Sequence, residues 1–328
     1  MIRILLNINQ LPKIQLRSTH PLAKSNQNQR KLTRKRIKNL KKPKEKIIPT
    51  YFYANYEADV VSKDHHIAYC ISYKQRDKED KKYDINFIYG KDCTKQFLNI
   101  LPDGAVVYFH NLAYDARMFS NYIISSSIDK GTKTISQRIK YEDKKITFKD
   151  SFSLITMALS KFPETFKLKS GQKEMFPYKY YTFKRLETNV GKISEAGENE
   201  FKDKWDQKQF DENIKNLNLF VDENGNHSET KTDYFNMIEY VKFYCNQDVN
   251  ILAQGYDEFR KLCLKCLNID CDEVLTAASL ANRYFEENLY YKVDNYYKYS
   301  GVVRAFIQQA VYGGRCMTAT KFCTKIKI

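Results

Sequence analysis

Apolar and polar positions in the first third of the chain follow a pattern that predicts a small sheet. Residues 51–58 are mainly aromatic and alternate with polar positions, as in a half-buried strand. Two more alternating runs, 66–73 and 83–89, predict a second and a third strand, joined by the charged residues 75–82. The uninterrupted apolar run 106–109 predicts a fourth, buried strand.

The pattern changes to a mixture of helices and strands after this run. A helix is expected to follow the fourth strand directly, with Asn111 as its N-cap. Residues 135–141 and 145–149 predict a hairpin, and residues 154–160 predict a short helix.

Helical spacing dominates the last third of the chain. Apolar residues recur on one face over 232–261, which predicts a long amphipathic helix that starts near Thr232 or Asp233. Shorter helical patterns cover 279–285 and 302–310.

The polar stretch 186–231 indicates a surface insertion before the long helix. Three strands, a strand with its helix and a late long helix are the order of an α/β, RNase H-like nuclease domain, with a mixed sheet flanked by helices.

Polar side chains interrupt this pattern at three places where chemistry is expected. Alternation puts Asn55 and Glu57 on the same side of the first strand. His110 and Asn111 end the buried strand and Asp115 lies one turn beyond them, where open sheets tend to bind ligands. The simpler alternative for Asn111 and Asp115 is an Asn cap followed by a solvated Asp.

The third place lies on the long helix. Tyr244 and Asp248 are one turn apart on its surface, and Asp248 falls between two apolar positions of the stripe. A carboxylate is costly to bury there unless it meets a cation or hydrogen-bond donors.

These three motifs, in this order, resemble the three motifs of the 3′→5′ exonuclease domain of family B DNA polymerases. They read Asn55-x-Glu57, Asn111-x-x-x-Asp115 and Tyr244-x-x-x-Asp248. The residues of the second and third motifs are most similar to those of the protein-primed branch, which occurs in linear plasmids, organelles, some viruses and large virus-like transposons.

The resemblance extends to three further segments. Residues 150–157 resemble the Ser-Leu segment that binds single-stranded DNA, 173–178 resemble a Lys-containing motif, and 311–315 resemble the Tyr-x-Gly-Gly linker, with Val311 at its first Tyr. A helix-ending Gly pair is the alternative for the last segment. The DNA-binding residues implied by the resemblance are His110, Asn111, Phe119, Ser153, Leu154, Lys173, Tyr312, Gly313, Gly314 and Arg315.

The resemblance also implies a two-metal mechanism. Glu57, Asp115 and Asp248 would bind two Mg²⁺ ions, and the Tyr244 hydroxyl would orient the attacking water. Asn55 completes the catalytic set, but the family carries Asp at this position. An amide brings no negative charge to two dications, so the site is expected to be impaired while the fold is unaffected.

Positive charge is concentrated at the N-terminus. Residues 1–49 hold 14 Lys and Arg and one acidic residue, a net charge of +13 out of +16 for the chain. A basic arm that contacts phosphate, an organellar presequence and a nuclear address all fit this composition. Mitochondrion, nucleus and viral element therefore stay open as locations. No run approaches the roughly 18 apolar residues of a membrane span, so no membrane partner is expected.

The eight cysteines do not form a convincing disulfide framework. Cys263, Cys266 and Cys271 suggest zinc, but packing of free thiols at a helix end is favoured because zinc fingers usually show two spaced pairs. Unpaired thiols fit a reducing compartment.

We expect a basic tail (1–49), an exonuclease domain (50–265, with the insertion 186–231) and a helical linker (266–328). The palm motifs of the family do not occur after residue 315, so the C-terminal helices are expected to lead toward a polymerase palm that this sequence does not contain. The expected function is part of a DNA-directed DNA polymerase in replication that carries the proofreading exonuclease. Its partners would be a single-stranded 3′ end, primer-template DNA and a terminal protein primer. A non-catalytic DNA-binding relic and a free-standing exonuclease are the alternatives.

Overall fold

A computed structural model describes most of the chain beyond the basic N-terminal segment. The described residues are 49–62, 65–169, 171, 174–198, 200, 205–288 and 301–310. Nearly all of the basic tail lies outside the described residues. Five of the expected DNA-binding residues also lie outside them: Lys173, Tyr312, Gly313, Gly314 and Arg315.

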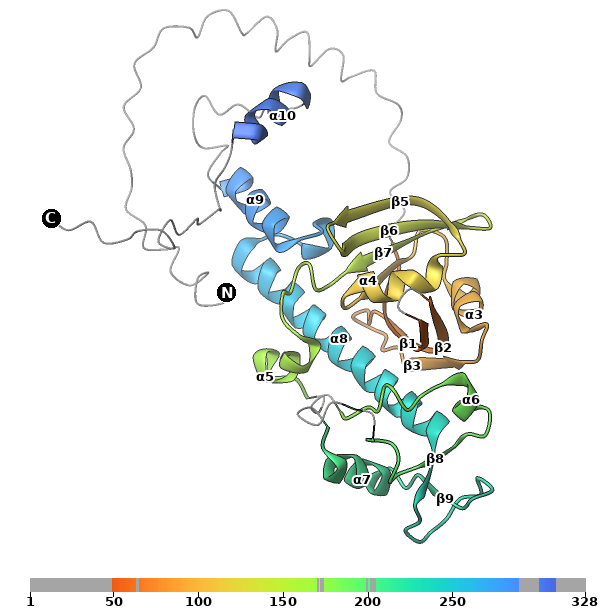
Figure 1. Cartoon of the computed structure of the whole chain (residues 1–328). Coiled ribbons are helices and arrows are strands. Elements are labelled where there is room, and N and C mark those ends of the chain that lie inside the picture. The colour runs from red at the N-terminus through yellow and green to blue at the C-terminus, as the bar shows by residue number, and fades with distance from the viewer. Residues whose placement is uncertain are drawn as a thin grey trace, which may run out of the picture. The chain divides into compact units, whose positions relative to one another are not determined.

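A seven-stranded mixed sheet forms the centre of the fold, with the strand order β3-β2-β1-β4-β7-β6-β5 (Figure 1). β4 pairs in parallel with β1 and β7, and the other pairs are antiparallel. The α/β class with a mixed sheet between helices is therefore confirmed. The strands are β1 (Tyr51–Ser62), β2 (His65–Gln75), β3 (Ile85–Tyr89), β4 (Val106–Phe109), β5 (Ile123–Lys130), β6 (Lys133–Tyr141) and β7 (Lys144–Asp150).

The predicted strands are present, and β5 is an additional one. β4 has the predicted bounds, and the predicted hairpin is β6 and β7, which turns at Glu142 with a φ of 52°. β5 is exposed at every position and lies at the edge of the sheet. A strand without a buried face shows no alternation of apolar and polar residues, so the pattern did not indicate it.

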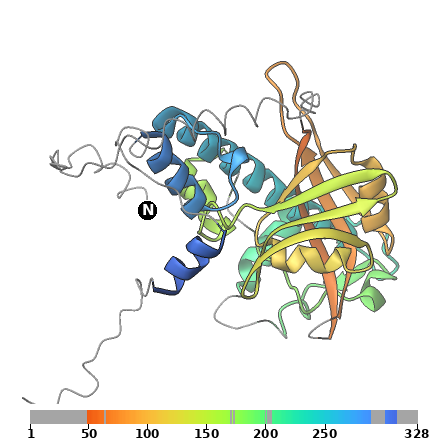
Figure 2. The same ribbon diagram turned by 90° about the horizontal axis from the view of Figure 1, so that it is seen from above.

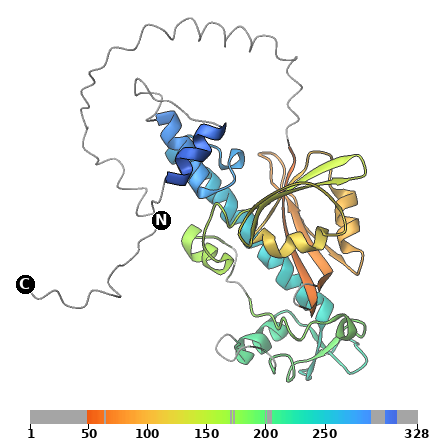
Figure 3. The same ribbon diagram turned by 45° about the horizontal axis from the view of Figure 1, so that its top comes forward.

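The sheet lies between helices on its two faces. α8 (Met237–Leu267) runs obliquely along one face, where Tyr53 of β1 is buried against it (Figures 1 and 3). α3 (Cys93–Ile100), α4 (Leu112–Asp115) and the short 3₁₀ helix η2 (Ala116–Phe119) cover the other face, as the view in Figure 2 shows. Alternate residues of β1 thus enter two separate cores.

The long helix starts five residues later than predicted. Residues 234–236 form the strand β10 (Tyr234–Asn236) instead, which pairs with β8 (Val190–Lys192) and β9 (Phe220–Val221). The Asn236 side chain accepts the Glu239 N–H at 2.9 Å and so caps α8 in place of Thr232 or Asp233.

The segment 186–231 does more than cover the surface. Besides β8 and β9 it contains α7 (Gln207–Asn216), whose Phe210 and Ile214 are buried against the first turns of α8. α6 (Phe183–Leu186) precedes it. This segment supplies a third apolar core around the start of the long helix.

The helix predicted over 154–160 does not form. The N–H groups of Leu154 and Ile155 both bind the Ser151 carbonyl in a turn, and a 3₁₀ helix η3 (Leu159–Lys161) leads into α5 (Phe162–Phe166). Local side-chain hydrogen bonds from the residues just before this turn compete with a helix. Pro163 then favours a helix start at residue 162.

The C-terminal helical patterns correspond to α9 (Ala277–Asn288) and α10 (Gly301–Ala310), after the 3₁₀ helix η4 (Cys271–Glu273). Within the described part of the chain, no helix combines the length and the apolar character needed to cross a membrane.

Candidate active site

Three buried carboxylates come from three different elements near the carboxyl ends of β1 and β4. Glu57 lies on β1, Asp115 ends α4, and Asp248 lies on α8, with exposed fractions of 6%, 4% and 3%. Asp115 accepts the N–H of Tyr56 at 3.3 Å, which places it beside Glu57 along the chain. The structure therefore brings the first and second motifs together.

Tyr244 links the third motif to the first. Burial raises the pKa of the Tyr244 hydroxyl well above its usual range, and the charges of Asp248 and Glu57 raise it further. Its ring stacks on Phe176, with 4.4 Å between the ring centroids, and its hydroxyl lies 2.5 Å from that of Tyr178. A hydroxyl that stays protonated next to two carboxylates is a hydrogen-bond donor at this point.

The three carboxylates share a region, but their oxygens are not gathered into one tight cluster. Among the described residues, one group of at least three His, Cys, Asp or Glu ligand atoms lies within 4.8 Å of one another, and it consists of Asp270, Cys271 and Asp272. The motif carboxylates surround a wider space than that.

Asp115 is strongly perturbed. Burial raises the pKa of its carboxyl well above the ordinary value of 3.8, although hydrogen bonds from the Tyr56 N–H and from its own N–H lower it. The nearby charge of Asp150 raises it further. Positive charge supplied from outside would stabilise the ionised form of this carboxyl.

Asn55 faces Glu57, as the alternation of β1 predicted. Its side-chain amide nitrogen donates to Glu57 Oε1 at 3.2 Å and lies 3.6 Å from Cys245 Sγ. The Cys245 thiol in turn donates to the backbone carbonyl oxygen of Asn55 at 3.2 Å. Asn55 thus contributes a donor where a second carboxylate would contribute charge.

A cavity of about 380 Å³ opens beside Asn55 and Asp248. Residues from β1, the β4–α4 turn, the segment after β7 and α8 line it together: Asn55, His110, Asn111, Phe152, Ala158, Leu159, Asp248 and Leu252. The lining combines polar side chains with aromatic and aliphatic ones, a mixture that suits a nucleotide with its phosphate and its base.

His110 is held from both ring nitrogens. Nδ1 lies 2.9 Å from Ser151 Oγ and Nε2 lies 3.0 Å from the Met157 carbonyl oxygen. A carbonyl oxygen only accepts, so Nε2 carries a hydrogen. The ring also meets Phe152 and Phe162 edge-on, with centroids 5.4 and 5.1 Å away.

Asn111 is not the side-chain cap that the sequence suggested. It stands at the N-cap position of α4, but it has a left-handed backbone (φ 74°, ψ 56°) and its side chain makes no capping bond. Asp150 replaces the cap from β7, because its Oδ1 accepts the N–H groups of Asn111 and Leu112 at 2.9 and 3.2 Å.

Two of the expected DNA-binding residues are buried in the protein core. Phe119 is fully buried and stacks on Phe148, with 4.1 Å between ring centroids, so it has no open face for a base. Leu154 is 2% exposed in the core beneath α8. The Ser153 hydroxyl donates to Asp150 Oδ2 at 2.6 Å.

Phe152 is an aromatic residue of the cavity that the sequence did not indicate. It is half-buried, lines the cavity, and has the Lys133 ammonium 5.2 Å from its ring centroid. Its position inside the Ser-Leu segment was the available signal, but only the fold shows which of the two neighbouring apolar side chains faces the cavity.

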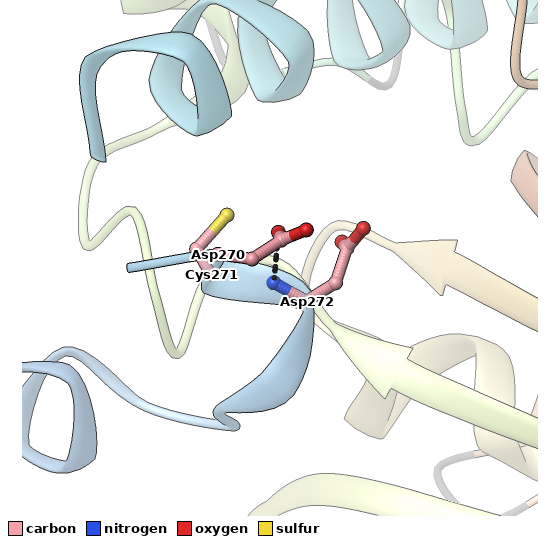
Figure 4. Close-up of side chains that lie close together, drawn as sticks. All are labelled: Asp270, Cys271 and Asp272. Atoms are coloured by element: carbon pink, nitrogen blue, oxygen red, sulfur yellow. Dashed lines mark hydrogen bonds between the residues drawn. The ribbon is translucent and has the colours of Figure 1, made fainter. Parts of the chain in front are cut away.

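The close group of Asp270, Cys271 and Asp272 on η4 is built as a structural cluster (Figure 4). Arg76 and Arg260 both form ion pairs with Asp272, and Arg260 also pairs with Asp270. The hydroxyls of Tyr108 and Tyr256 donate to Asp272 Oδ1 at 2.9 and 3.0 Å. Two guanidinium groups already neutralise these carboxylates, so the cluster does not require a metal.

The cysteines near this cluster are free thiols. Cys263 and Cys271 are buried, while Cys266 is exposed. A neighbouring thiol raises the pKa of Cys263, since the two buried side chains contact each other. This arrangement agrees with packing at the end of α8 and does not present a zinc ligand set.

Comparison with known proteins gives a family. The family model of organellar and viral type B DNA polymerases matches residues 97–328. No curated protein matches the chain. Solved structures of the phi29 DNA polymerase are similar to this chain. The complex with single-stranded DNA has 13% sequence identity and a TM-score of 0.42, and the match covers 73% of this chain and 35% of that chain. The ternary complex with primer-template DNA and nucleotides has 11% sequence identity and a TM-score of 0.45, and the match covers 79% of this chain and 38% of that chain.

The chain therefore spans well under half the length of the phi29 polymerase chains that it matches. The family match, by contrast, extends from α3 to the last residue and includes the second and third motifs. This chain belongs to the organellar and viral family of type B DNA polymerases.

Proposed function

We propose that this chain binds a single-stranded 3′ end of DNA in the cavity and removes nucleotides from it slowly, in a reaction that depends on Mg²⁺. The observation that carries the proposal is that the buried Glu57 and Asp248 both lie near Tyr244, while the buried Asp115 binds the N–H of the residue next to Glu57. Asp248 also lines an open cavity that has polar and aromatic lining residues. Membership of a DNA polymerase family supports DNA as the substrate.

The donor set fits Mg²⁺ in kind. All three carboxylates are buried, and the groups that shift the pKa of Asp115 include no cation. Glu57, Asp115 and Asp248 would hold the metal, because hard divalent cations prefer carboxylate oxygen. Bound Mg²⁺ would supply an activated water and neutralise the leaving oxygen of the phosphodiester.

The other residues would bind and orient the substrate. The protonated Tyr244 hydroxyl is placed to donate to the attacking water, and Phe152 offers a ring on which the terminal base can stack, a contact worth roughly 1–3 kcal/mol. His110 and Asn111 line the same cavity and would contact a sugar or phosphate.

Asn55 favours a weak nuclease. With three carboxylates in place of four, the site leaves more positive charge of two dications uncompensated, so the second metal should bind weakly. In the whole protein this domain would serve a replicative DNA polymerase as its proofreading exonuclease, with primer-template DNA and a terminal protein primer as partners. A DNA-binding domain without catalysis is the second candidate, and the Asn55 amide is the observation that favours it.

An oligonucleotide assay of the full chain tests the proposal. A single-stranded oligonucleotide labelled at its 5′ end is incubated with Mg²⁺ and the wild type, Asp248→Ala or Asn55→Asp. We expect slow stepwise shortening by the wild type, none by Asp248→Ala, and at least tenfold faster shortening by Asn55→Asp, because a restored charge of this kind is worth about 1.4 kcal/mol or more in the transition state.

Asp143→Ala, at an exposed position of the β6–β7 turn, is the matched control and should behave like the wild type. Binding of the oligonucleotide in Ca²⁺ without shortening by any variant would support the DNA-binding alternative. Rapid shortening by the wild type would show that the amide is a competent substitute, and an absence of binding would contradict both functions.

A further inference from the structure

The segment that follows β7 holds the start of α4 through one carboxylate. Asp150 Oδ1 accepts three backbone N–H groups, from Asn111 at 2.9 Å, Leu112 at 3.2 Å and Phe152 at 3.1 Å. Its Oδ2 accepts the Ser153 hydroxyl at 2.6 Å, and the side chain is buried. Four donors therefore converge on this one buried carboxylate, and three of them share a single oxygen.

Asn111 needs such support because of its backbone. A non-glycine residue in the left-handed region costs of order 1–3 kcal/mol and persists only where its surroundings impose it. Two charge-assisted hydrogen bonds, to the N–H of Asn111 and to that of the next residue, are of the strength needed to hold the turn. The Asn111 side chain takes no part in capping and instead lines the cavity.

Asp150 also holds a second residue that lines the cavity. Phe152, whose N–H binds the same oxygen, lines the cavity from the segment after β7, whereas Asn111 lines it from the end of β4. β4 and β7 are neighbouring parallel strands, so the two residues stand on separate pieces of chain that one carboxylate joins.

A neighbouring side chain makes a parallel link. The Ser151 hydroxyl lies 2.9 Å from both the Phe109 carbonyl oxygen and His110 Nδ1. The residues at the end of β4 are therefore held by consecutive residues at the end of β7.

We propose that Asp150 is a positioning residue that fixes Asn111 and Phe152 relative to each other, so that the pair grips the terminal nucleotide of a single-stranded 3′ end. This inference rests on the proposed function. Asp150 acts through the two cavity residues and touches neither metal nor substrate. Removing its carboxylate should therefore weaken DNA binding only to the extent that Asn111 and Phe152 contribute to it.

A double-mutant cycle on the full chain measures this coupling. Binding of a fluorescent single-stranded oligonucleotide is followed by anisotropy in Ca²⁺ for the wild type, Asn111→Ala, Asp150→Ala and the double variant. We expect each single variant to bind at least about tenfold more weakly, as for the loss of one hydrogen bond, and the double variant to bind no more weakly than Asp150→Ala alone. Asp143→Ala, an exposed Asp on the turn before β7, should bind like the wild type.

Asp150→Asn serves if Asp150→Ala does not fold. The amide keeps an acceptor for the three N–H groups but loses the charge, which roughly halves the strength of such bonds, so we expect about threefold weaker binding. Combined with Asn111→Ala, the loss should be smaller than the product of the two single losses. Losses that multiply in the double variant, or unchanged binding by Asp150→Asn, would overturn the proposal.

Hydrogen exchange separates this inference from the proposed function. If the wild type binds no DNA, the proposed function fails, but the amide protons of Asn111 and Leu112 still report on the clamp. They should exchange several-fold faster in Asp150→Asn than in the wild type. Unchanged exchange at both amides would overturn the clamp itself.

Discussion

Asp115 is the residue whose environment has the clearest energetic consequence. Burial raises its pKa, so the folded protein holds a proton there more tightly than the unfolded chain does. The stability from this proton is fully present below the ordinary pKa of 3.8 and is lost as the pH rises through the raised value. Toward neutral pH and without metal, the burial of this carboxyl therefore lowers the stability of the fold.

We predict that Asp115→Asn stabilises the protein at pH 7 in the absence of divalent cations. The neutral amide removes the cost of a buried charge, so the thermal midpoint should rise by on the order of 2–4 °C for each kcal/mol relieved. Melting curves from pH 5 to pH 8 in EDTA provide the measurement. The difference between wild type and variant should grow with pH.

Added Mg²⁺ supplies the control. It should stabilise the wild type more than Asp115→Asn, because the variant has lost a metal ligand. Asp143→Asn, at an exposed position, should follow the wild type throughout. A midpoint that does not differ between Asp115→Asn and the wild type at any pH would refute the prediction.

At the residue scale, local patterns in the sequence predicted part of the candidate site. The two-residue period of a strand placed Asn55 beside Glu57, and the end of a buried strand placed His110 and Asn111. The roles of Asp150 and Phe152 arise from the pairing of β4 with β7, which joins positions about 40 residues apart. The pattern of residues within a single strand or helix does not reveal which strands pair, so it could not predict these two roles.

At the scale of elements, strands and helices with one buried face were predictable. β4 and the β6–β7 hairpin show this. The start of α8 was not predictable, because the strand β10 just before it is stabilised by pairing with β8 and β9, which are distant in sequence. The segment 154–160 has apolar residues at helical spacing, but side-chain hydrogen bonds and Pro163 determine its turn.

Contact between α5 and α8 depends on a glycine. A Cβ added at Gly255 would lie 2.2 Å from Cδ2 of Phe162, a fully buried ring that also meets His110 edge-on. We predict that Gly255→Ala lowers the free energy of unfolding. The helix gains about 1 kcal/mol in propensity, but overpacking costs about 1–3 kcal/mol, and a contact this short belongs at the upper end.

Chemical denaturation of Gly255→Ala measures the change. Leu262→Ala is the control, because Leu262 is largely exposed on the same helix. DNA binding should weaken together with stability, because a displaced Phe162 ring would shift His110, which it contacts and which lines the cavity. A variant more stable than the wild type would show that α5 yields easily and that helix propensity dominates.

At the scale of the whole molecule, charge separates the chain into unequal parts. Residues 1–49 carry +13 of the total of +16, so the remaining 279 residues carry little net charge. General attraction to the phosphate backbone should therefore come from the N-terminal segment, whereas recognition of a strand end is the role proposed for the cavity.

We predict that deleting residues 1–49 weakens binding to any DNA and flattens its dependence on salt. For a single strand, the slope of log K against log salt should fall by about 0.7 for every phosphate that the deleted segment neutralises. Anisotropy titrations at several salt concentrations measure this slope. A variant with Gln in place of the Lys and Arg of residues 30–46 separates charge from length, and an equal slope in all forms would exclude the segment as a phosphate contact.

The ion pair between Arg76 and Asp272 joins residues 196 positions apart, and the Tyr53–Asp257 hydrogen bond joins residues 204 apart. During synthesis at about 5–20 residues per second, Arg76 would wait roughly 10–40 s for its partner. The first strands leave the ribosome long before η4 exists. Folding of this domain is therefore expected to finish after translation of its last 3₁₀ helix, and a nascent chain would hold an unneutralised guanidinium among the rings of its forming core until then.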